Sequence, residues 1–156
     1  MSQQQSESER AAWHKRFAAE CNNRAWELTT AARGAPEDRE MLDVAHASAW
    51  HWGKVGSELN RMRATMLLAE VHALLGMGER ALANAEEMRT YFLAHESPDW
   101  EIAFAHAIYA HAAHAAGRAN EHRDAYAQAE AALAAIADDE DRAIVAATFR
   151  LVPPPA

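Results

Sequence analysis

Residues 67–85, LLAEVHALLGMGERALANA, contain two apolar runs separated by a glycine-rich turn. An apolar helical run ends at two glycines, Gly76 and Gly78, and a second run follows with Ala81 and Ala85 one turn apart. Glycine ends helices because it adopts the left-handed backbone conformation without steric cost. Alanine side chains allow two helix axes to come close together. The stretch therefore predicts a tight helical hairpin.

The same order of features returns in residues 109–133, where Gly117 takes the turn position 41 residues after Gly76. Along the rest of the chain, apolar stripes at helical spacing alternate with glycine, proline and capping residues. The links between the stripes are short, which makes consecutive helices antiparallel neighbours. These signals predict helices at about 6–33, 37–54, 58–75, 79–95, 98–116, 120–136 and 139–150.

The composition supports an all-α fold with one domain. Alanine, which has the highest helix propensity, supplies 39 of the 156 residues, whereas Val, Ile and Thr together supply 14. We expect about seven helices in an antiparallel helix-hairpin stack over residues 6–151, between a disordered tail at 1–5 and a proline-rich tail at 152–156. The first helix should start at a capping box of Ser6 and Glu9 and stop at Gly34.

The formal net charge of −8 indicates which partners the chain does not suit. A nucleic-acid binder needs Lys and Arg to displace counterions, and an anionic membrane surface attracts the same residues, so neither is expected as a partner. No run approaches 18 apolar residues, and the polar N-terminus lacks the apolar region of a secretory signal. A cytoplasmic protein is therefore expected, and its single cysteine, Cys21, fits a reducing compartment.

Residues 67–85 and 109–133 resemble the tetratricopeptide repeat, in which an alanine-rich helix, a glycine turn and a second helix with small packing residues follow one another. The spacing of 41 residues between the turns exceeds the 34 of that family, so the chain resembles the wider tetratricopeptide-like class with long helices. The turn glycines are Gly76 and Gly117, and the small packing residues are Ala81 and Ala125.

Residues 45–56, AHASAWHWGKVG, are similar to a group of bacterial tetratricopeptide-like proteins that carry no assigned activity. Together the resemblances cover roughly residues 37–140. They imply a tetratricopeptide-like α-α superhelix and an interaction role, and they imply no reaction.

A first cluster that could carry chemistry lies in the helix expected at 37–54. Asp43, His46 and Trp50 are spaced i, i+3 and i+7 and share one face, with His51 next to them in the chain. A carboxylate and an imidazole one turn apart can chelate a metal or orient each other for proton transfer. In the alternative interpretation, the tryptophans pack between the first and third helices and His46 is a hydrogen-bonded interhelix residue.

A second cluster, in the helix expected at 98–116, comprises His106, His111 and His114. His111 and His114 share a face, and His106 lies about 80° from His114 at ~100° per residue. One helix supplies at most two ligands of a zinc site, so His72 or His122 would have to complete it from a neighbouring helix. In the alternative interpretation, these are polar histidines that line a groove.

These observations predict a non-catalytic scaffold that binds a protein or peptide and needs no cofactor. The first helix of each pair should line a concave groove, with Asn60, Arg63, His106 and His111 near it. An apolar end of the stack could also join two copies into a homodimer. The alternative function is the binding of a small molecule or a metal in a closed pocket built by His46, His51 and the Trp50/Trp52 pair. A third hypothesis is an enzyme with proton-transfer chemistry at Asp43 and His46.

Overall fold

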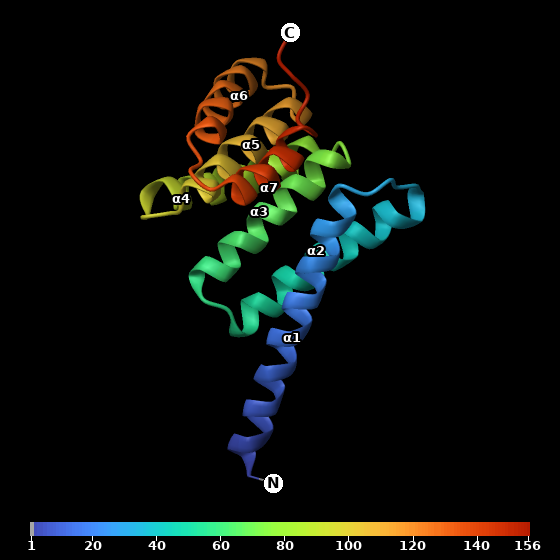
Figure 1. Ribbon diagram of the computed structural model, residues 1–156. Helices are drawn as coiled ribbons and strands as arrows, with labels where there is room; N and C mark the ends of the chain where they lie inside the picture. Colours follow the sequence, from blue (N-terminus) through green and yellow to red (C-terminus); the bar gives the residue numbers. More distant parts are fainter. Residues whose placement is uncertain (1) are drawn as a thin grey trace.

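The computed structural model describes residues 2–156 and folds them into seven α-helices, with no β-strand among these residues (Figure 1). The prediction of an all-α stack of about seven helices is confirmed. The helices are α1 (Gln3–Thr29), α2 (Ala35–Val55), α3 (Glu58–Leu74), α4 (Gly78–Ala94), α5 (Asp99–Ala115), α6 (Ala119–Ala134) and α7 (Asp139–Phe149).

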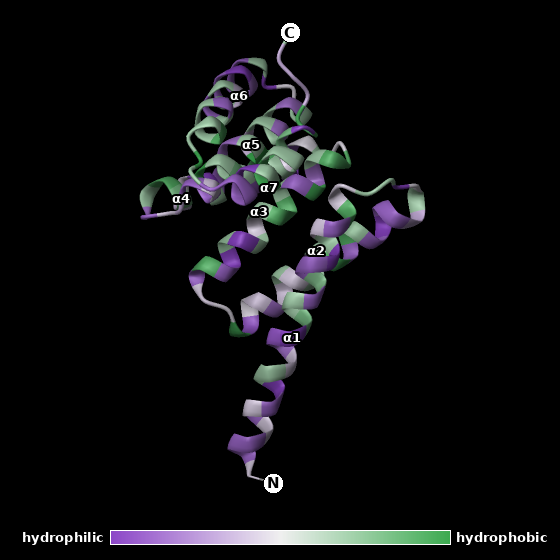
Figure 2. Cartoon of the chain, in the orientation of Figure 1, coloured by the Kyte–Doolittle hydropathy of each residue, from purple (hydrophilic) through white to green (hydrophobic). Residues whose placement is uncertain are grey.

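The helices form three consecutive hairpins and a closing helix. Helices α1 and α2, α3 and α4, and α5 and α6 pack as pairs, and α7 packs on α5 and α6. Helix α3 also contacts α1 and α5, and α5 contacts α7, so the first helices of the pairs lie side by side in one layer with α7. The N-terminal half of α1 projects beyond the stack, and Figure 2 shows mostly hydrophilic residues along it.

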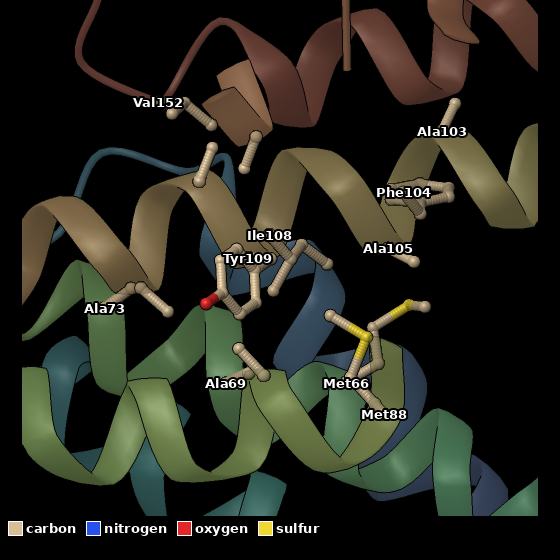
Figure 3. Packing of buried hydrophobic residues seen from close by; sticks show 14 of the residues in the cluster. Met66, Ala69, Ala73, Met88, Ala103, Phe104, Ala105, Ile108, Tyr109 and Val152 are labelled. Atoms are coloured by element: carbon tan, nitrogen blue, oxygen red, sulfur yellow. The ribbon is translucent and has the colours of Figure 1, made fainter. Parts of the chain in front are cut away.

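Alanine and a few bulky apolar residues fill the space between the hairpins. The predicted stripe of α4 (Ala81, Ala85, Met88 and Phe92) is completely buried. It belongs to a core cluster that spans α3 to α7 and that includes Met66 and Met88, which are drawn below α5 in Figure 3. Close-packed interiors of this kind have no room for larger side chains, so the small residues fix how near the helices lie.

Two glycine turns with the same geometry close the second and third hairpins. Gly76 and Gly117 both have a φ of 72°, the left-handed conformation in which other residues are strained. The residue after each glycine donates a backbone hydrogen bond to a carbonyl in the last turn of the preceding helix. Met77 donates to the carbonyl of His72 over 2.8 Å, and Arg118 donates to the carbonyl of Ala113 over 2.8 Å. This is the Schellman arrangement, which satisfies carbonyl groups at a helix end.

Both ends of α1 differ from the expectation. The helix starts at Gln3, because Ser2 and Gln5 form the capping box one turn before Ser6 and Glu9. Met1 of the expected tail at 1–5 lies outside the described residues. The helix stops at Thr29, where the guanidinium group of Arg33 donates to the carbonyls of Leu28 and Thr29. Gly34 therefore caps the start of α2 and is not the C-terminal stop of α1.

The expected proline-rich tail is anchored at its beginning. Val152 is buried in the core, and the carbonyl oxygen of Pro153 lies 2.7 Å from Nε2 of His122. None of the helices in residues 2–156 combines the length and the apolar character that a membrane span requires.

We predict opposite effects of alanine at two glycines. A Cβ atom at Gly78 would collide with the backbone carbonyl of Ala115, so Gly78→Ala should lower the free energy of unfolding by about 1–3 kcal/mol. At Gly53, inside α2, a Cβ atom meets nothing within 4 Å, so Gly53→Ala should raise it by about 0.5–1 kcal/mol. Urea denaturation measures both. Equal effects of the two substitutions would contradict the close contact at Gly78.

Candidate functional site

A groove of about 570 Å³ opens on the layer formed by the first helices and α7. Its lining residues come from α1, α3, α5 and α7. Pockets of this size suit small ligands or a few side chains of a partner. Its main apolar lining consists of Trp26 from α1, Met66 from α3, Trp100 and Phe104 from α5, and Ile144 from α7.

Aromatic rings form the walls of the groove and join helices that are distant in sequence. The ring of Trp26 lies 5.8 Å from that of Phe104, between their centroids, and Trp100 meets Phe104 edge to face at 6.3 Å. Ile144 is 61% exposed at the α7 edge. The apolar surface of this side chain is therefore available to a partner.

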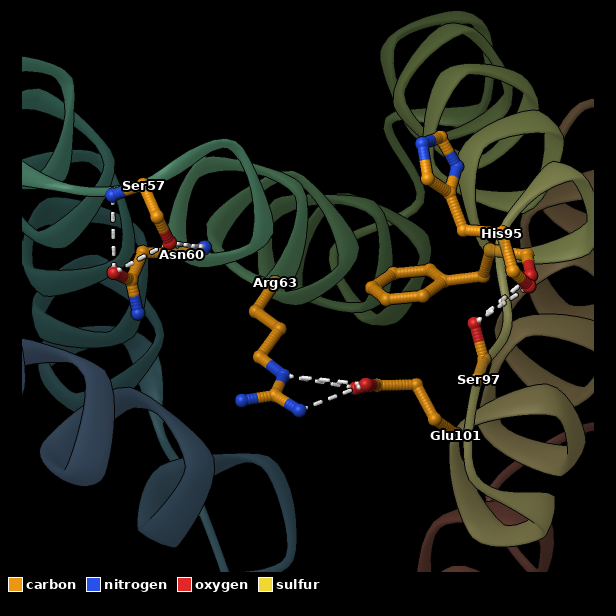
Figure 4. A network of polar contacts seen from close by, with 7 residues as sticks. Ser57, Asn60, Arg63, His95, Ser97 and Glu101 are labelled. Atoms are coloured by element: carbon orange, nitrogen blue, oxygen red, sulfur yellow. Dashed lines mark hydrogen bonds and ion pairs between the residues drawn. The ribbon is translucent and has the colours of Figure 1, made fainter.

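An ion pair between α3 and α5 orders the polar part of the groove. The Arg63 guanidinium donates from Nη2 to Oε1 of Glu101 over 2.8 Å and from Nε to Oε2 over 3.0 Å (Figure 4). The hydrogen bonds to Glu101 raise the pKa of Arg63. Its guanidinium also lies 5.5 Å from the centroid of the Trp100 ring. Because Glu101 is only 2% exposed, the pair neutralises a buried carboxylate and fixes the arginine against the aromatic wall.

One end of the groove is acidic. A smaller hollow of about 210 Å³ shares Trp100, Phe104 and Ile144 with the groove and ends at Asp141. Burial raises the pKa of Asp141, and repulsion from Asp138, Asp99 and Glu140 raises it further. This concentration of carboxylates favours a positively charged group at that end.

The structure brings only one of the four predicted groove residues, Arg63, into the groove lining. Asn60 instead completes the cap of α3, where its Oδ1 accepts from the backbone N–H of Ser57 over 3.1 Å (Figure 4). His111 is buried about two turns after the groove residue Phe104 on α5. Its Nδ1 lies 3.1 Å from Oε2 of the fully buried Glu70.

His106 lies about 160° around α5 from Phe104, at ~100° per residue, and does not belong to the groove lining. Its Nδ1 is buried without a hydrogen-bond partner among the described residues. Burial lowers the pKa of His106, and the neighbouring charge of Arg89 lowers it further. The predicted second cluster is divided between separate partners. His111 pairs with Glu70, whereas His114 lies against His122 of α6, one of the two residues expected to join it, with ring centroids 4.9 Å apart.

The predicted cluster on α2 faces outward. Asp43 and His46 are exposed, and Trp50 is 57% exposed, so the interpretation in which this tryptophan packs between α1 and α3 is wrong. His46 lies with its ring edge on against His72 of α3, and His51 places Nδ1 2.9 Å from Nδ1 of His14 in α1. The face is a surface with paired rings and not a closed pocket.

Within residues 2–156, no group of three or more His, Cys, Asp or Glu side chains is arranged to hold a metal ion. The imidazoles meet in pairs across helix contacts, and a pair alone leaves a zinc ion two ligands short of a closed tetrahedral site.

Most groove residues were missed by the sequence analysis. Trp100 and Phe104 are spaced i, i+4, which is a signal for one helix face, but α5 is apolar on nearly every side. Ile144 belongs to a helix that the acidic run at its start marks as a polar cap. Its isolated exposed side chain gives no periodic signal.

No protein-family model, curated protein or solved structure matches the chain.

Removal of Arg63 should destabilise the fold more than neutralisation of Glu101. Arg63→Met leaves a buried carboxylate without its partner, which should cost about 3 kcal/mol in the free energy of unfolding. Glu101→Gln keeps an acceptor and leaves a half-exposed guanidinium that water can solvate, so about 1 kcal/mol is expected. Arg80→Met, at an exposed position on α4, is the matched control in urea denaturation. A loss no larger than that of the control would contradict the structural role of the pair.

Acidification should weaken the fold. Burial lowers the pKa values of His51, His72, His106 and His114, so each binds its proton less readily in the folded than in the unfolded chain. The unfolded chain therefore binds more protons below its histidine pKa of about 6.5, and stability falls as the pH drops through this window. Thermal unfolding at pH 7.5, 6.5 and 5.5 should give successively lower midpoints, and His72→Gln should flatten the dependence. A midpoint that rises on acidification would contradict the prediction.

Proposed function

We propose that the chain is a non-catalytic, tetratricopeptide-like scaffold whose groove binds an extended peptide or a helix of a partner protein. The observation that carries the proposal is the groove of about 570 Å³ with walls of Trp26, Trp100 and Phe104. Large aromatic side chains around a pocket are the usual centre of a protein interface, because they bury much apolar area with little loss of conformational freedom. The layer of first helices also supports the tetratricopeptide-like comparison, since such solenoids bind partners on that side.

The groove favours a partner with an apolar or aromatic side chain next to a Lys or Arg. The charge of Arg63 is satisfied by Glu101 within the groove, so the aromatic part of the site is close to neutral. The carboxylates around Asp141 give the adjoining end of the groove a negative charge. An apolar anchor would enter between the rings while the basic side chain lies over the acidic end.

Groove chemistry supports binding and not catalysis. The ionisable side chains in the lining are Arg63, Glu101 and Glu27, of which the first two neutralise each other and the third pairs with Arg24 at 3.2 Å. No histidine, cysteine or serine belongs to the lining among the described residues. Of its three threonines, Thr29 and Thr30 donate their hydroxyls to backbone carbonyls, and no hydrogen bond within residues 2–156 joins Thr148 to a basic side chain, so the groove offers no activated nucleophile beside a base.

The proposal predicts which peptides bind and which substitution stops them. Selection from a phage-displayed peptide library on the purified protein should enrich sequences with a Trp, Phe or Leu beside a Lys or Arg. Affinities of the synthetic peptides, measured by calorimetry, should fall at least about tenfold when a charge enters the groove in Ile144→Arg, because an arginine there occupies the apolar space and repels the basic residue.

Leu93→Arg is the matched control, because Leu93 is 51% exposed on α4 and does not line the groove. It should leave the affinity unchanged. A peptide in which Glu replaces the basic residue should bind more weakly than the parent. Equal losses in the two protein variants, or enrichment of acidic sequences, would overturn the proposal.

A further inference from the structure

The projecting half of α1 carries exposed aromatic surface outside the groove. Trp13 is 52% exposed and Phe17 is 40% exposed, and their rings stack at 5.6 Å between centroids. All residues from 2 to 13 are exposed, so no other element of the described chain covers this segment. Isolated helical segments are marginal in water, and an aromatic stripe on one of them indicates a partner surface.

A hollow lies beside the aromatic pair. It measures about 390 Å³, and its walls are formed by one face of α1 and by His51 of α2, whose Nδ1 lies 2.9 Å from that of His14. The space is large enough for an indole ring, which occupies well under half of such a volume. The lining residues on α1 include Ser6, Arg10, Trp13 and Phe17.

The charges around Trp13 are self-complementary. At ~100° per residue, Glu9 and Arg16 both lie about 40–60° to the same side of Trp13. Glu9 lies four residues before Trp13, and Arg16 lies three residues after it. Because an α-helix rises about 1.5 Å per residue, Glu9 and Arg16 lie at nearly equal distances from Trp13 along the helix axis, on opposite sides of it. Two such helices that run antiparallel about a two-fold axis near Trp13 present the same flank to each other. Glu9 of each copy then faces Arg16 of the other.

We propose that this surface binds a second copy of the chain. The two α1 helices cross antiparallel, the Trp13 ring of each copy enters the hollow of the other, and two Glu9–Arg16 ion pairs form along one edge. On the opposite edge, Arg10 lies across Phe17 of the second copy, where a guanidinium group is attracted to the aromatic face. An isologous contact of this kind closes after two copies and leaves both grooves open. The inference is independent of the groove proposal.

Sedimentation velocity over a concentration series tests the pairing. The wild-type chain should shift from monomer to dimer as concentration rises. Trp13→Ala should remain monomeric, and circular dichroism should show that it is still folded, because the side chain is exposed. Glu9→Arg should weaken the dimer on the order of tenfold, because both ion pairs become repulsive. The double variant Glu9→Arg/Arg16→Glu reverses each pair and should recover part of that loss, because Arg16→Glu also removes the 3.0 Å ion pair of Arg16 with Glu20 within α1.

Glu7→Arg is the matched control for the charge change, since Glu7 lies about 120° from Trp13 around the helix axis. It should leave the dissociation constant close to that of the wild type. A wild-type chain that stays monomeric at every concentration overturns the proposal, as does a dimer that Trp13→Ala leaves intact. If Glu7→Arg and Glu9→Arg weaken the dimer equally, or the double variant recovers nothing, the antiparallel register is wrong.

Discussion

The close approach of alanine-lined helices is the constraint on which the rest of the structure depends. Two left-handed glycines, Gly76 and Gly117, reverse the chain within a few residues, and small side chains then let the returning helix lie against its predecessor. Because both hairpins turn in the same way, their first helices fall into one layer. Trp26, Met66 and Phe104 come from three different hairpins, and this shared layer brings them to a common groove. The proposed binding surface therefore follows from the packing and not from a local motif.

Polar groups inside the stack refine this arrangement. Two polar pairs join α3 to α5: Arg63 with Glu101 at the groove and Glu70 with His111 in the interior. Apolar packing tolerates small shifts of one helix along another, whereas a buried carboxylate accepts only the register in which its partner is within reach. We infer that the pairs fix the sliding of α5 on α3, and with it the distance between the aromatic walls.

The sequence predicted the helices better than it predicted the site. Breaks at Gly76 and Gly117 and the stripe from Ala81 to Phe92 are local signals, so all seven helices and the buried face of α4 were predicted correctly. The groove depends on contacts between hairpins, and a helix such as α5, apolar on almost all sides, has no periodicity to mark its exposed face. His111 shows the same limit, since only the fold places Glu70 beside it. The first and last turns of α1 were misplaced because Gln5 and Arg33 provide caps that compete with the expected ones.

The first and third hairpins meet at the aromatic wall of the groove. Nuclear Overhauser effects in isotope-labelled protein measure this directly, because the rings of Trp26 and Phe104 are 5.8 Å apart between centroids although they belong to α1 and α5. Cross-peaks are expected between the ring protons of these two residues, together with cross-peaks from the Ile144 methyl groups to Trp100 or Phe104. Assigned spectra in which Trp26 shows contacts only to α1 and α2 would contradict this meeting of the two hairpins.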